Sequence, residues 1–194
     1  MRAFALLAAA LLATCGGESA AAPATIRLDD CAGVAHAPLN APDGQLTVLV
    51  FTSHECPIAN AMAPVLAELA ERFATRPVRF FMVHVDPDLT AADAAQHARD
   101  YRLPGTVLLD PYHDLAQRLH VRRTPEAVVW QNRQVVYRGL IDDQWHDLGA
   151  RAQSASHEYL RDAITAALAG EPIAVTDTEP VGCLLPEPQP RPRD

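Results

Sequence analysis

The chain lacks both an excess of positive charge and a long apolar run. Its 24 aspartates and glutamates outnumber its 16 lysines and arginines, which gives the 194 residues a net charge of −8. Proteins that bind nucleic acid present a basic face to the phosphates, so this balance argues against such a partner. The apolar run at the N-terminus, Ala3–Ala13, is too short to span a bilayer and is typical of an export signal.

Two cleavage sites compete for the end of this signal. Leu12–Cys15 resembles a bacterial lipobox, with an unusual Thr14, and would make Cys15 a lipidated N-terminus that attaches the protein to a membrane. Ala20–Ala22 offers small residues for ordinary cleavage. We therefore expect residues 1–24 to be a signal peptide and tether, and the mature protein to be periplasmic or a membrane-anchored lipoprotein of a bacterial envelope.

Cysteine is scarce, with four residues in the chain. If Cys15 is lipidated or removed, Cys31, Cys56 and Cys183 remain, and three cysteines cannot all pair within one chain. Export leads to an oxidising compartment in which a disulfide persists. Ligand spacing for a metal is also missing, because no histidine pair lies at helical or hairpin spacing near a cysteine. We expect neither a metal nor another cofactor.

What the chain does contain is an alternation of apolar strands and amphipathic helices. Strands are predicted at 46–52, 78–85 and 106–109, helices at 57–74, 90–101, 110–119 and 154–169, and a hairpin of strands at 127–130 and 134–138. The first strands need crossover connections and are therefore parallel, whereas the hairpin adds antiparallel strands. The order predicts a three-layer α/β domain over residues 25–170, with a central mixed sheet and helices on both faces. Residues 171–194 form a C-terminal extension that carries Cys183 and ends in a proline-rich tail, which we expect to be disordered.

The most informative segment is Cys56–Ala59, where the first buried strand gives way to a helix. Backbone N–H groups at a helix start lack partners and favour negative charge, so they favour the thiolate form of Cys56. The thiolate is the reactive form of cysteine. Pro57 suits the first helical position, and Pro64 is expected to kink the helix. This arrangement indicates that Cys56 is the nucleophile of a thiol redox reaction.

These features resemble the thioredoxin superfamily over about residues 39–170. Three pieces carry the resemblance: the strand, cysteine and helix in which Pro64 follows Cys56 by eight residues, the segment Arg123–Pro125, and the hairpin with its final helix. Four segments further resemble exported bacterial redoxins of the alkyl hydroperoxide reductase and thiol-specific antioxidant group: Ser53–Pro57, Thr124–Glu126, Tyr137–Asp143 and Pro180–Cys183.

The resemblance implies a site around Cys56. A cis peptide bond before Pro125 would face the cysteine, and the backbone of Thr124 would hold an extended peptide. Nearby side chains offer support of several kinds. A protonated His54 would stabilise the thiolate, Arg123 could stabilise a thiolate or a peroxide oxygen, and Glu126 could shuttle a proton.

Three positions depart from the family patterns. Thioredoxins carry a second cysteine where this chain has Ala59, so the usual internal dithiol is missing. Peroxiredoxins carry a proline where it has Leu49 and a threonine where it has Ser53. Ser53 keeps a hydroxyl, but the pattern is incomplete. We therefore favour disulfide exchange over peroxide reduction.

The missing second cysteine raises the question of what resolves an oxidised Cys56. A mixed disulfide or a sulfenic acid needs another thiol to attack it. Cys183 is the first candidate, in a pairing that is either redox-active or structural. A Cys31–Cys183 bridge that leaves Cys56 free and an external thiol are the alternatives.

The leading hypothesis is an exported thiol–disulfide oxidoreductase or thiol peroxidase that acts through Cys56. Its partners would be a protein disulfide or a hydroperoxide as substrate and an external thiol as reductant. One alternative is a non-enzymatic binding module with a thioredoxin-like fold, in which a permanent Cys56–Cys183 bridge leaves the groove at Pro125 to hold a partner chain. The other alternative is a copper chaperone.

Overall fold

The computed structural model describes residues 25–192 of the chain. The expected signal peptide, both cleavage sites and Cys15 lie outside these residues. Among the residues that are described, no helix has the length and apolar character that crossing a membrane requires.

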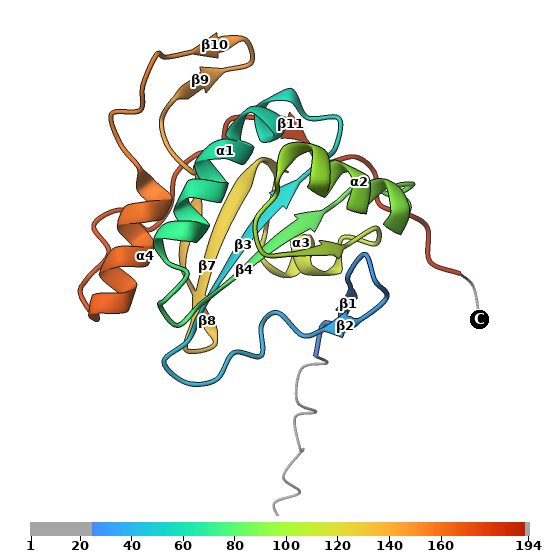
Figure 1. Cartoon of the computed structure of the whole chain (residues 1–194), viewed down its shortest axis with the longest axis horizontal. Helices are drawn as coiled ribbons and strands as arrows, with labels where there is room; N and C mark the ends of the chain where they lie inside the picture. The colour runs from blue at the N-terminus through green and yellow to red at the C-terminus, as the bar shows by residue number, and fades with distance from the viewer. Residues whose placement is uncertain (1–24, 193–194) are drawn as a thin grey trace, which may run out of the picture.

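A five-stranded mixed sheet forms the centre of the domain, in the order β5-β4-β3-β7-β8. Its strands are β3 (Leu46–Thr52), β4 (Val78–His84), β5 (Thr106–Leu109), β7 (Glu126–Gln131) and β8 (Gln134–Gly139). β3, β4 and β5 are parallel, and β7 runs antiparallel to both β3 and β8. The mixed sheet predicted from the sequence is confirmed, and Figure 1 shows it twisting behind α1 and α2.

Helices cover both faces of the sheet, which confirms the three-layer arrangement. They are α1 (Pro57–Arg72), α2 (Ala91–Tyr101), α3 (Asp114–Arg118) and α4 (Tyr159–Ala169). On one face, α1 and α4 pack against Val48 and Val50, and on the other α3 packs against Leu49 and Phe51. Side chains alternate between the faces of a strand, so the single apolar run of β3 supplies both cores.

Helix α3 begins later than the sequence predicted, at Asp114 rather than at Asp110. His113 has a left-handed φ of 57° and interrupts the helical path. The Asp110 Oδ2 atom accepts the backbone N–H groups of Leu115 and Ala116 at 3.1 and 2.9 Å. Asp110 therefore caps the helix across a turn and does not begin it.

Helix α4 also begins later, at Tyr159 rather than at the predicted Ser154. The Asp143 Oδ1 atom accepts the backbone N–H groups of Ser156 and His157 at 2.7 and 2.9 Å. These bonds tie Ser156 and His157 to the side chain of Asp143 and so hold the segment before the helix in a non-helical path.

Three short strand pairs carry no signal in the sequence. They are β1 (Leu28–Asp29) with β2 (Ala35–His36), β9 (Trp145–Asp147) with β10 (Ala150–Arg151), and β6 (Arg123–Thr124) with β11 (Cys183–Leu184). Each strand has only two or three residues, which is too short for a period of two to appear. The β9–β10 hairpin projects beyond α1 and α4, whereas β11 lies close to the start of α1 (Figure 1).

The C-terminal extension lies along the sheet and continues towards α3. Beside β8, the backbone of Arg138 donates to the carbonyl of Thr176 and accepts from the N–H of Thr178, both at 3.0 Å. Further on, the N–H of Gln189 donates to the carbonyl of Pro111 at 2.8 Å, and Arg191 pairs with Asp114. The prediction of a disordered proline-rich tail is therefore wrong for residues 185–192, since these contacts fix it against the domain.

Candidate active site

Cys56 is held where β3 meets α1, as the sequence predicted. It is the N-cap of α1, and Pro57 occupies the first turn. Its side chain is 1% exposed, and as a thiol its Sγ donates to the carbonyl oxygen of Thr124 at 3.0 Å. Burial raises the pKa of Cys56, but hydrogen bonds from Cys183 and from the backbone of Ala59 outweigh it, so the pKa lies below its ordinary value. Because the hydrogen bonds outweigh burial, the lowered pKa of Cys56 favours its thiolate form.

The peptide bond between Thr124 and Pro125 is cis, as the resemblance implies. Thr124 is fully buried, and its carbonyl oxygen faces the Cys56 thiol. The residues on either side of this bond therefore shape the wall against which Cys56 packs.

Cys183 reaches the same wall from the C-terminal extension. Strand β11 pairs antiparallel with β6, and this pairing sets Cys183 opposite Thr124 and Leu184 opposite Arg123. Cys56 and Cys183 are both free thiols. Burial, followed by the neighbouring Cys56, raises the pKa of Cys183 to about 11. The pair is thus unequal: Cys56 is the sulfur that ionises, and Cys183 is the one that keeps its proton.

The close approach of β11 to β6 depends on Gly182. A Cβ atom at this position would overlap the carbonyl oxygen of Thr124. The neighbouring carbonyl is also used, since the Arg123 Nη1 atom donates to the Gly182 oxygen at 2.9 Å. The structure therefore places Arg123 as an anchor for the extension, whereas the sequence had suggested that it stabilises a thiolate or a peroxide.

Glu126 follows the cis bond and is fully buried. Its Oε2 atom accepts the backbone N–H groups of Arg122 and Arg123 at 2.8 and 3.2 Å. Burial raises the pKa of Glu126, and these two hydrogen bonds oppose that shift. Glu126 does not line the cavity that contains Cys56. Its contacts fix the loop before β7, which is a different role from the proton shuttle that the sequence suggested.

A cavity of about 790 Å³ opens beside the two cysteines. Its walls carry five residues of chemical interest: Ser53, His54, Cys56, Asp86 and Cys183. The Ser53 hydroxyl donates to Asp86 Oδ1 at 2.5 Å. Burial raises the pKa of Asp86, but hydrogen bonds from His84 and Ser53 outweigh it and lower that pKa to about 2. A carboxylate that is charged at every working pH therefore lies in the wall.

Sequence reasoning missed Asp86, and it assigned no role to His84 or His97. Both histidines are buried in the structure, behind the cavity, and burial lowers the pKa of His97 to about 4. Only their positions in space connect them to the site, because they lie on β4 and α2. Over residues 25–192, no group of three or more histidine, cysteine or acidic side chains is arranged to hold a metal ion.

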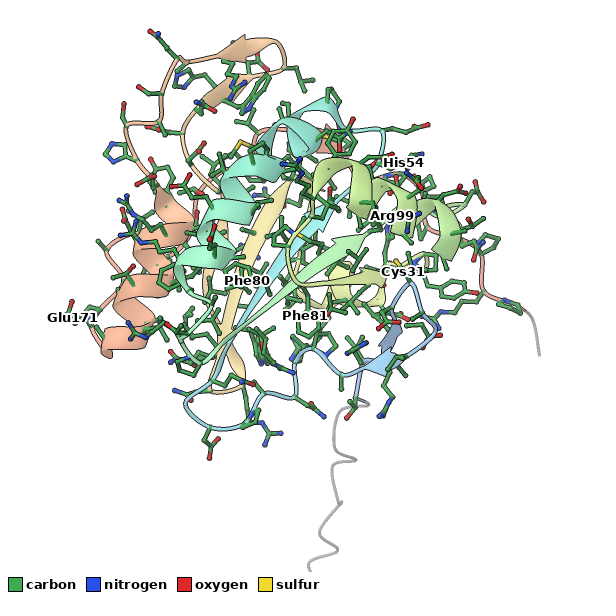
Figure 2. All side chains as sticks on the ribbon, viewed as in Figure 1. Cys31, His54, Phe80, Phe81, Arg99 and Glu171 are labelled. Carbon is green, nitrogen blue, oxygen red and sulfur yellow. The ribbon has the colours of Figure 1, made fainter. Side chains whose placement is uncertain are left out.

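Cys31 lies apart from the other two described cysteines. Figure 2 shows it below Arg99 and away from His54, which marks the neighbourhood of Cys56. Its Sγ contacts the carbonyl oxygen of Val107 at 3.8 Å. Burial, followed by the charge of Asp30, raises the pKa of the Cys31 thiol. This thiol is therefore less reactive than Cys56.

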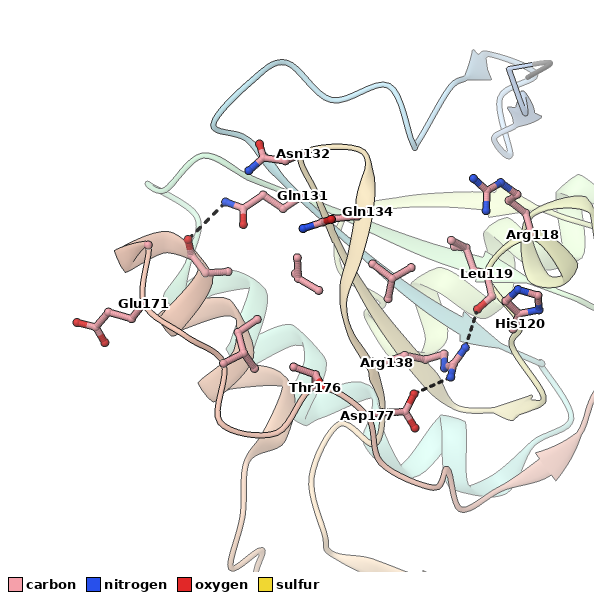
Figure 3. A pocket seen from close by; sticks show the side chains of 15 residues that line it. Arg118, Leu119, His120, Gln131, Asn132, Gln134, Arg138, Glu171, Thr176 and Asp177 are labelled. Carbon is pink, nitrogen blue, oxygen red and sulfur yellow. Dashed lines mark hydrogen bonds and ion pairs between the residues drawn. The ribbon is translucent and has the colours of Figure 1, made fainter. Parts of the chain in front are cut away.

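A second cavity, of about 880 Å³, lies between β8, the end of α4 and the C-terminal extension (Figure 3). Its main polar feature is Arg138, which donates to Asp177 at 2.6 Å and to the carbonyl of Leu119 at 3.4 Å. None of its lining residues is a cysteine. The thiol chemistry therefore belongs to the cavity beside Cys56.

The Ser53→Ala variant is expected to unfold more easily than the parent protein. It removes a buried hydrogen bond to a charged carboxylate, and such bonds contribute about 1.5–3 kcal/mol to the free energy of unfolding. The folded-state pKa of Asp86, about 2, is below the unfolded value of about 4, so this stabilisation is complete above pH 4 and is lost as the pH falls through 2. Urea unfolding at pH 7 and at pH 2.5 measures both effects.

The control is Ser154→Ala, at an exposed position before α4. It should leave the free energy of unfolding unchanged at both pH values. An equal loss for Ser53→Ala at pH 7 and pH 2.5 would contradict the assignment of an ionised Asp86.

Comparison with known proteins places the chain in a family. The model of the AhpC/TSA family matches residues 20–142. A hypothetical protein from Sinorhizobium meliloti 1021 has a TM-score of 0.74 and 21% identity, over 84% of this chain and 90% of its own. A secreted disulfide oxidoreductase from Mycobacterium tuberculosis, homologous to E. coli DsbE, has a TM-score of 0.54 and 18% identity, over 75% and 96%. No protein with a curated description matches the chain.

The two solved structures are only 21% and 18% identical to this chain, so the comparison with them shows the fold alone. The family match carries more, because it spans most of the sheet and includes Cys56, the cis Thr124–Pro125 bond and the hairpin of β7 and β8. On this evidence the chain belongs to the AhpC/TSA family of thioredoxin-like redoxins.

Proposed function

We propose that the protein is an exported thiol–disulfide oxidoreductase in which Cys56 attacks the substrate and Cys183 resolves the mixed disulfide. The observation that carries this proposal is the β11–β6 pairing, which sets Cys183 opposite Thr124 while the Cys56 thiol donates to the carbonyl of that same Thr124. The extension supplies in space the second thiol that Ala59 does not supply in sequence.

The reaction balances with these two sulfurs. The Cys56 thiolate attacks one sulfur of a substrate disulfide, and the other substrate sulfur leaves as a thiolate that takes up a proton. Cys183 then loses its proton and attacks the Cys56 sulfur, which releases the second substrate thiol. The substrate gains two electrons and two protons, and the protein is left with a Cys56–Cys183 disulfide. An external dithiol reductant reduces this disulfide and completes the cycle.

Access to Cys56 sets a condition on this cycle. The side chain is 1% exposed, since β11 lies over it. A substrate disulfide reaches the sulfur through the adjoining cavity or after β11 has separated from β6. A two-residue strand can separate at low cost, because few backbone hydrogen bonds are lost.

Disulfide exchange is favoured over peroxide reduction. The Ser53 hydroxyl, which stands where peroxiredoxins have a threonine, donates to Asp86 at 2.5 Å and is committed to that contact. Leu49, which stands in place of the family's proline, is fully buried in the second core.

A binding module with a permanent disulfide is the second candidate, and one observation favours it. Cys56 is 1% exposed and lies beside Cys183, so a bridge between the two would be shielded from reductants. Because β11 already pairs with β6 beside the cis bond, the partner of such a module would bind elsewhere than at that edge.

Disulfide mapping of the mature protein by mass spectrometry tests the proposal. After mild oxidation, we expect the peptides that contain Cys56 and Cys183 to be joined, with the loss of two hydrogens, and Cys31 to remain free. A mild dithiol should reopen the bridge, after which Cys56 should be alkylated rapidly below pH 7. A bridge that resists mild reduction supports the binding module, and a link that involves Cys31 contradicts the proposed pairing.

The same spectra test export. We expect the mature N-terminus to be either a lipidated Cys15 or a residue just after Ala22. An N-terminus that retains the apolar run Ala3–Ala13 would contradict the exported location.

A further inference from the structure

A chain of polar contacts runs behind the wall of the cavity beside Cys56. It begins at Asn60 on α1, whose Oδ1 atom lies 2.8 Å from His97 Nε2. His97 Nδ1 lies 3.3 Å from His84 Nε2, and His84 Nδ1 lies 3.0 Å from Asp86 Oδ2. Asp86 reaches the cavity, where its Oδ1 atom lies 3.2 Å from Nδ1 of His54.

The protons along this chain follow from one fixed acceptor. The Asn60 Nδ2 atom donates to the carbonyl oxygen of His54 at 2.9 Å, and a carbonyl can only accept. Asn60 Oδ1 is therefore the acceptor that faces His97, so His97 Nε2 carries a proton. Because the pKa of His97 is lowered to about 4 by burial and by the neighbouring histidines, its ring is neutral and its Nδ1 is bare.

His84 lies between His97 and Asp86 and contacts both. Its Nε2 faces His97, and its Nδ1 donates to the carboxylate of Asp86. The other partners of Asp86, the Ser53 hydroxyl and the backbone N–H of His54, are also donors. The fully buried His84 and the ionised carboxylate of Asp86 therefore form a hydrogen-bonded pair next to the cavity.

The carboxylate of Asp86 also determines which ring nitrogen of His54 carries a proton. Asp86 is an acceptor on every side, so the His54 nitrogen that faces it, Nδ1, is the one that carries the proton. The two atoms lie 3.2 Å apart, and this nitrogen of His54 has no hydrogen-bond partner elsewhere. Nε2 is left as the basic nitrogen of a side chain that is 39% exposed and lines the same cavity as Cys56 and Cys183.

We propose that His54, oriented by Asp86, is the proton-transfer group of the Cys56–Cys183 pair. Its Nε2 atom accepts the proton of the Cys183 thiol, directly or through one water, as that sulfur attacks the mixed disulfide on Cys56. The same proton then passes to the substrate sulfur that leaves, so His54 ends the step in its starting form. Asp86 and His84 are positioning residues. This inference rests on the proposed function, since it assigns the proton of its second step.

The need for such a group follows from the two thiols. Burial raises the pKa of Cys183 and still acts when Cys56 is in the mixed disulfide, so the Cys183 thiol holds its proton, whereas a thiol attacks a disulfide only as its thiolate. The other charged groups near His54 are carboxylates: Glu55, at 3.9 Å from Nε2, and Asp88 and Asp93 in the cavity wall. His97 also faces it, with ring centres 6.5 Å apart. Of the residues that line the cavity, His54 is the one that carries an imidazole.

Release of 5-thio-2-nitrobenzoate from the aromatic disulfide DTNB separates the two steps of the reaction. We use the full mature chain with Cys31→Ser, and with Cys15→Ser where that residue is retained, so that only Cys56 and Cys183 react. DTNB is added at one equivalent per protein, so the first equivalent of thiol reports the attack by Cys56, and the second can come only from the attack by Cys183 on the mixed disulfide. In the parent protein, the rate of the second release should level off in the neutral pH range.

In His54→Gln, we expect the second release to slow by about 10²-fold at pH 7 and to rise steadily with pH, because the thiol must then ionise unaided. Added imidazole should restore part of that rate, which a purely structural defect would not allow. The first release should change far less. His157→Gln, at an exposed position before α4, is the control and should behave as the parent.

The outcomes separate this inference from the proposed function. If the parent releases only one equivalent and keeps the thionitrobenzoate group on Cys56, Cys183 is not the resolving thiol and the proposed function fails. If Cys183→Ser abolishes the second release but His54→Gln keeps the parent's rate and pH profile, the proposed function stands and the role of His54 is overturned. Loss of both releases in His54→Gln, with no recovery in imidazole, also overturns it.

Discussion

The Cys56→Ser variant is expected to lose its activity towards a protein disulfide by about 10³-fold or more, because no other described thiol combines a lowered pKa with a place at the helix start. The fold should be kept. A serine hydroxyl can still donate to the carbonyl of Thr124, as the thiol does at 3.0 Å. Reduction of insulin, followed by turbidity, measures the loss, and thermal unfolding checks the fold.

The matched control is Cys31→Ser. Cys31 is partly buried, and its thiol has a raised pKa, so its replacement should leave the rate unchanged. Full activity of Cys56→Ser towards both insulin and a hydroperoxide would remove Cys56 from the reaction. Loss of activity in Cys31→Ser alone would identify Cys31, which lies beside β5, as the nucleophile.

The Gly182→Ala variant is expected to change the two steps in opposite directions. The added Cβ overlaps the carbonyl oxygen of Thr124, so β11 must move away from β6. Cys56 then becomes more accessible, and its first reaction with DTNB should speed up. Cys183 loses its alignment with Cys56, and its reaction with the mixed disulfide should slow by about 10²-fold or more. The two phases of thiol release measure both changes.

Val175→Ala is the control for this variant, because Val175 is exposed in the same extension before its contacts with β8. It should leave both phases as they are in the parent. If Gly182→Ala slows neither phase, or if both slow together with a loss of folded structure, then β11 does not act as a separable cover for Cys56.

The oppositely shifted pKa values of Cys56 and Cys183 explain why the two cysteines take different parts. A thiolate that is readily formed is a good leaving group as well as a good nucleophile, which suits a sulfur that must form a mixed disulfide and then release it. A thiol that holds its proton does not compete for the substrate. Cys183 therefore acts only once the mixed disulfide has formed, when proximity favours its attack on Cys56.

Most of the central sheet could be predicted from local pattern. The predicted strands at 46–52 and 106–109 coincide with β3 and β5, and the first two helices begin as their N-terminal residues indicate. The turn at Asn132 and Arg133 is also where it was expected, with φ values of 50° and 65°. Two helix starts were predicted too early, in α3 and α4, where Asp110 and Asp143 bind nearby backbone N–H groups. The short strand pairs and the ordered tail were missed as well, because contacts between distant segments form them.

By itself, the sequence determined the domain type, the position of Cys56 at a helix start and the absence of a partner cysteine at Ala59, because each of these depends on neighbours along the chain. Only the tertiary structure decided what surrounds Cys56. The pairing of β11 with β6 brings Cys183 to Cys56. Asp86, in the cavity wall after β4, contacts His84 of β4, which in turn contacts His97 of α2. The physical reason is that a hydrogen bond or ion pair between residues far apart in sequence needs only one suitably placed side chain on each element. Such single residues produce no periodic pattern along the chain.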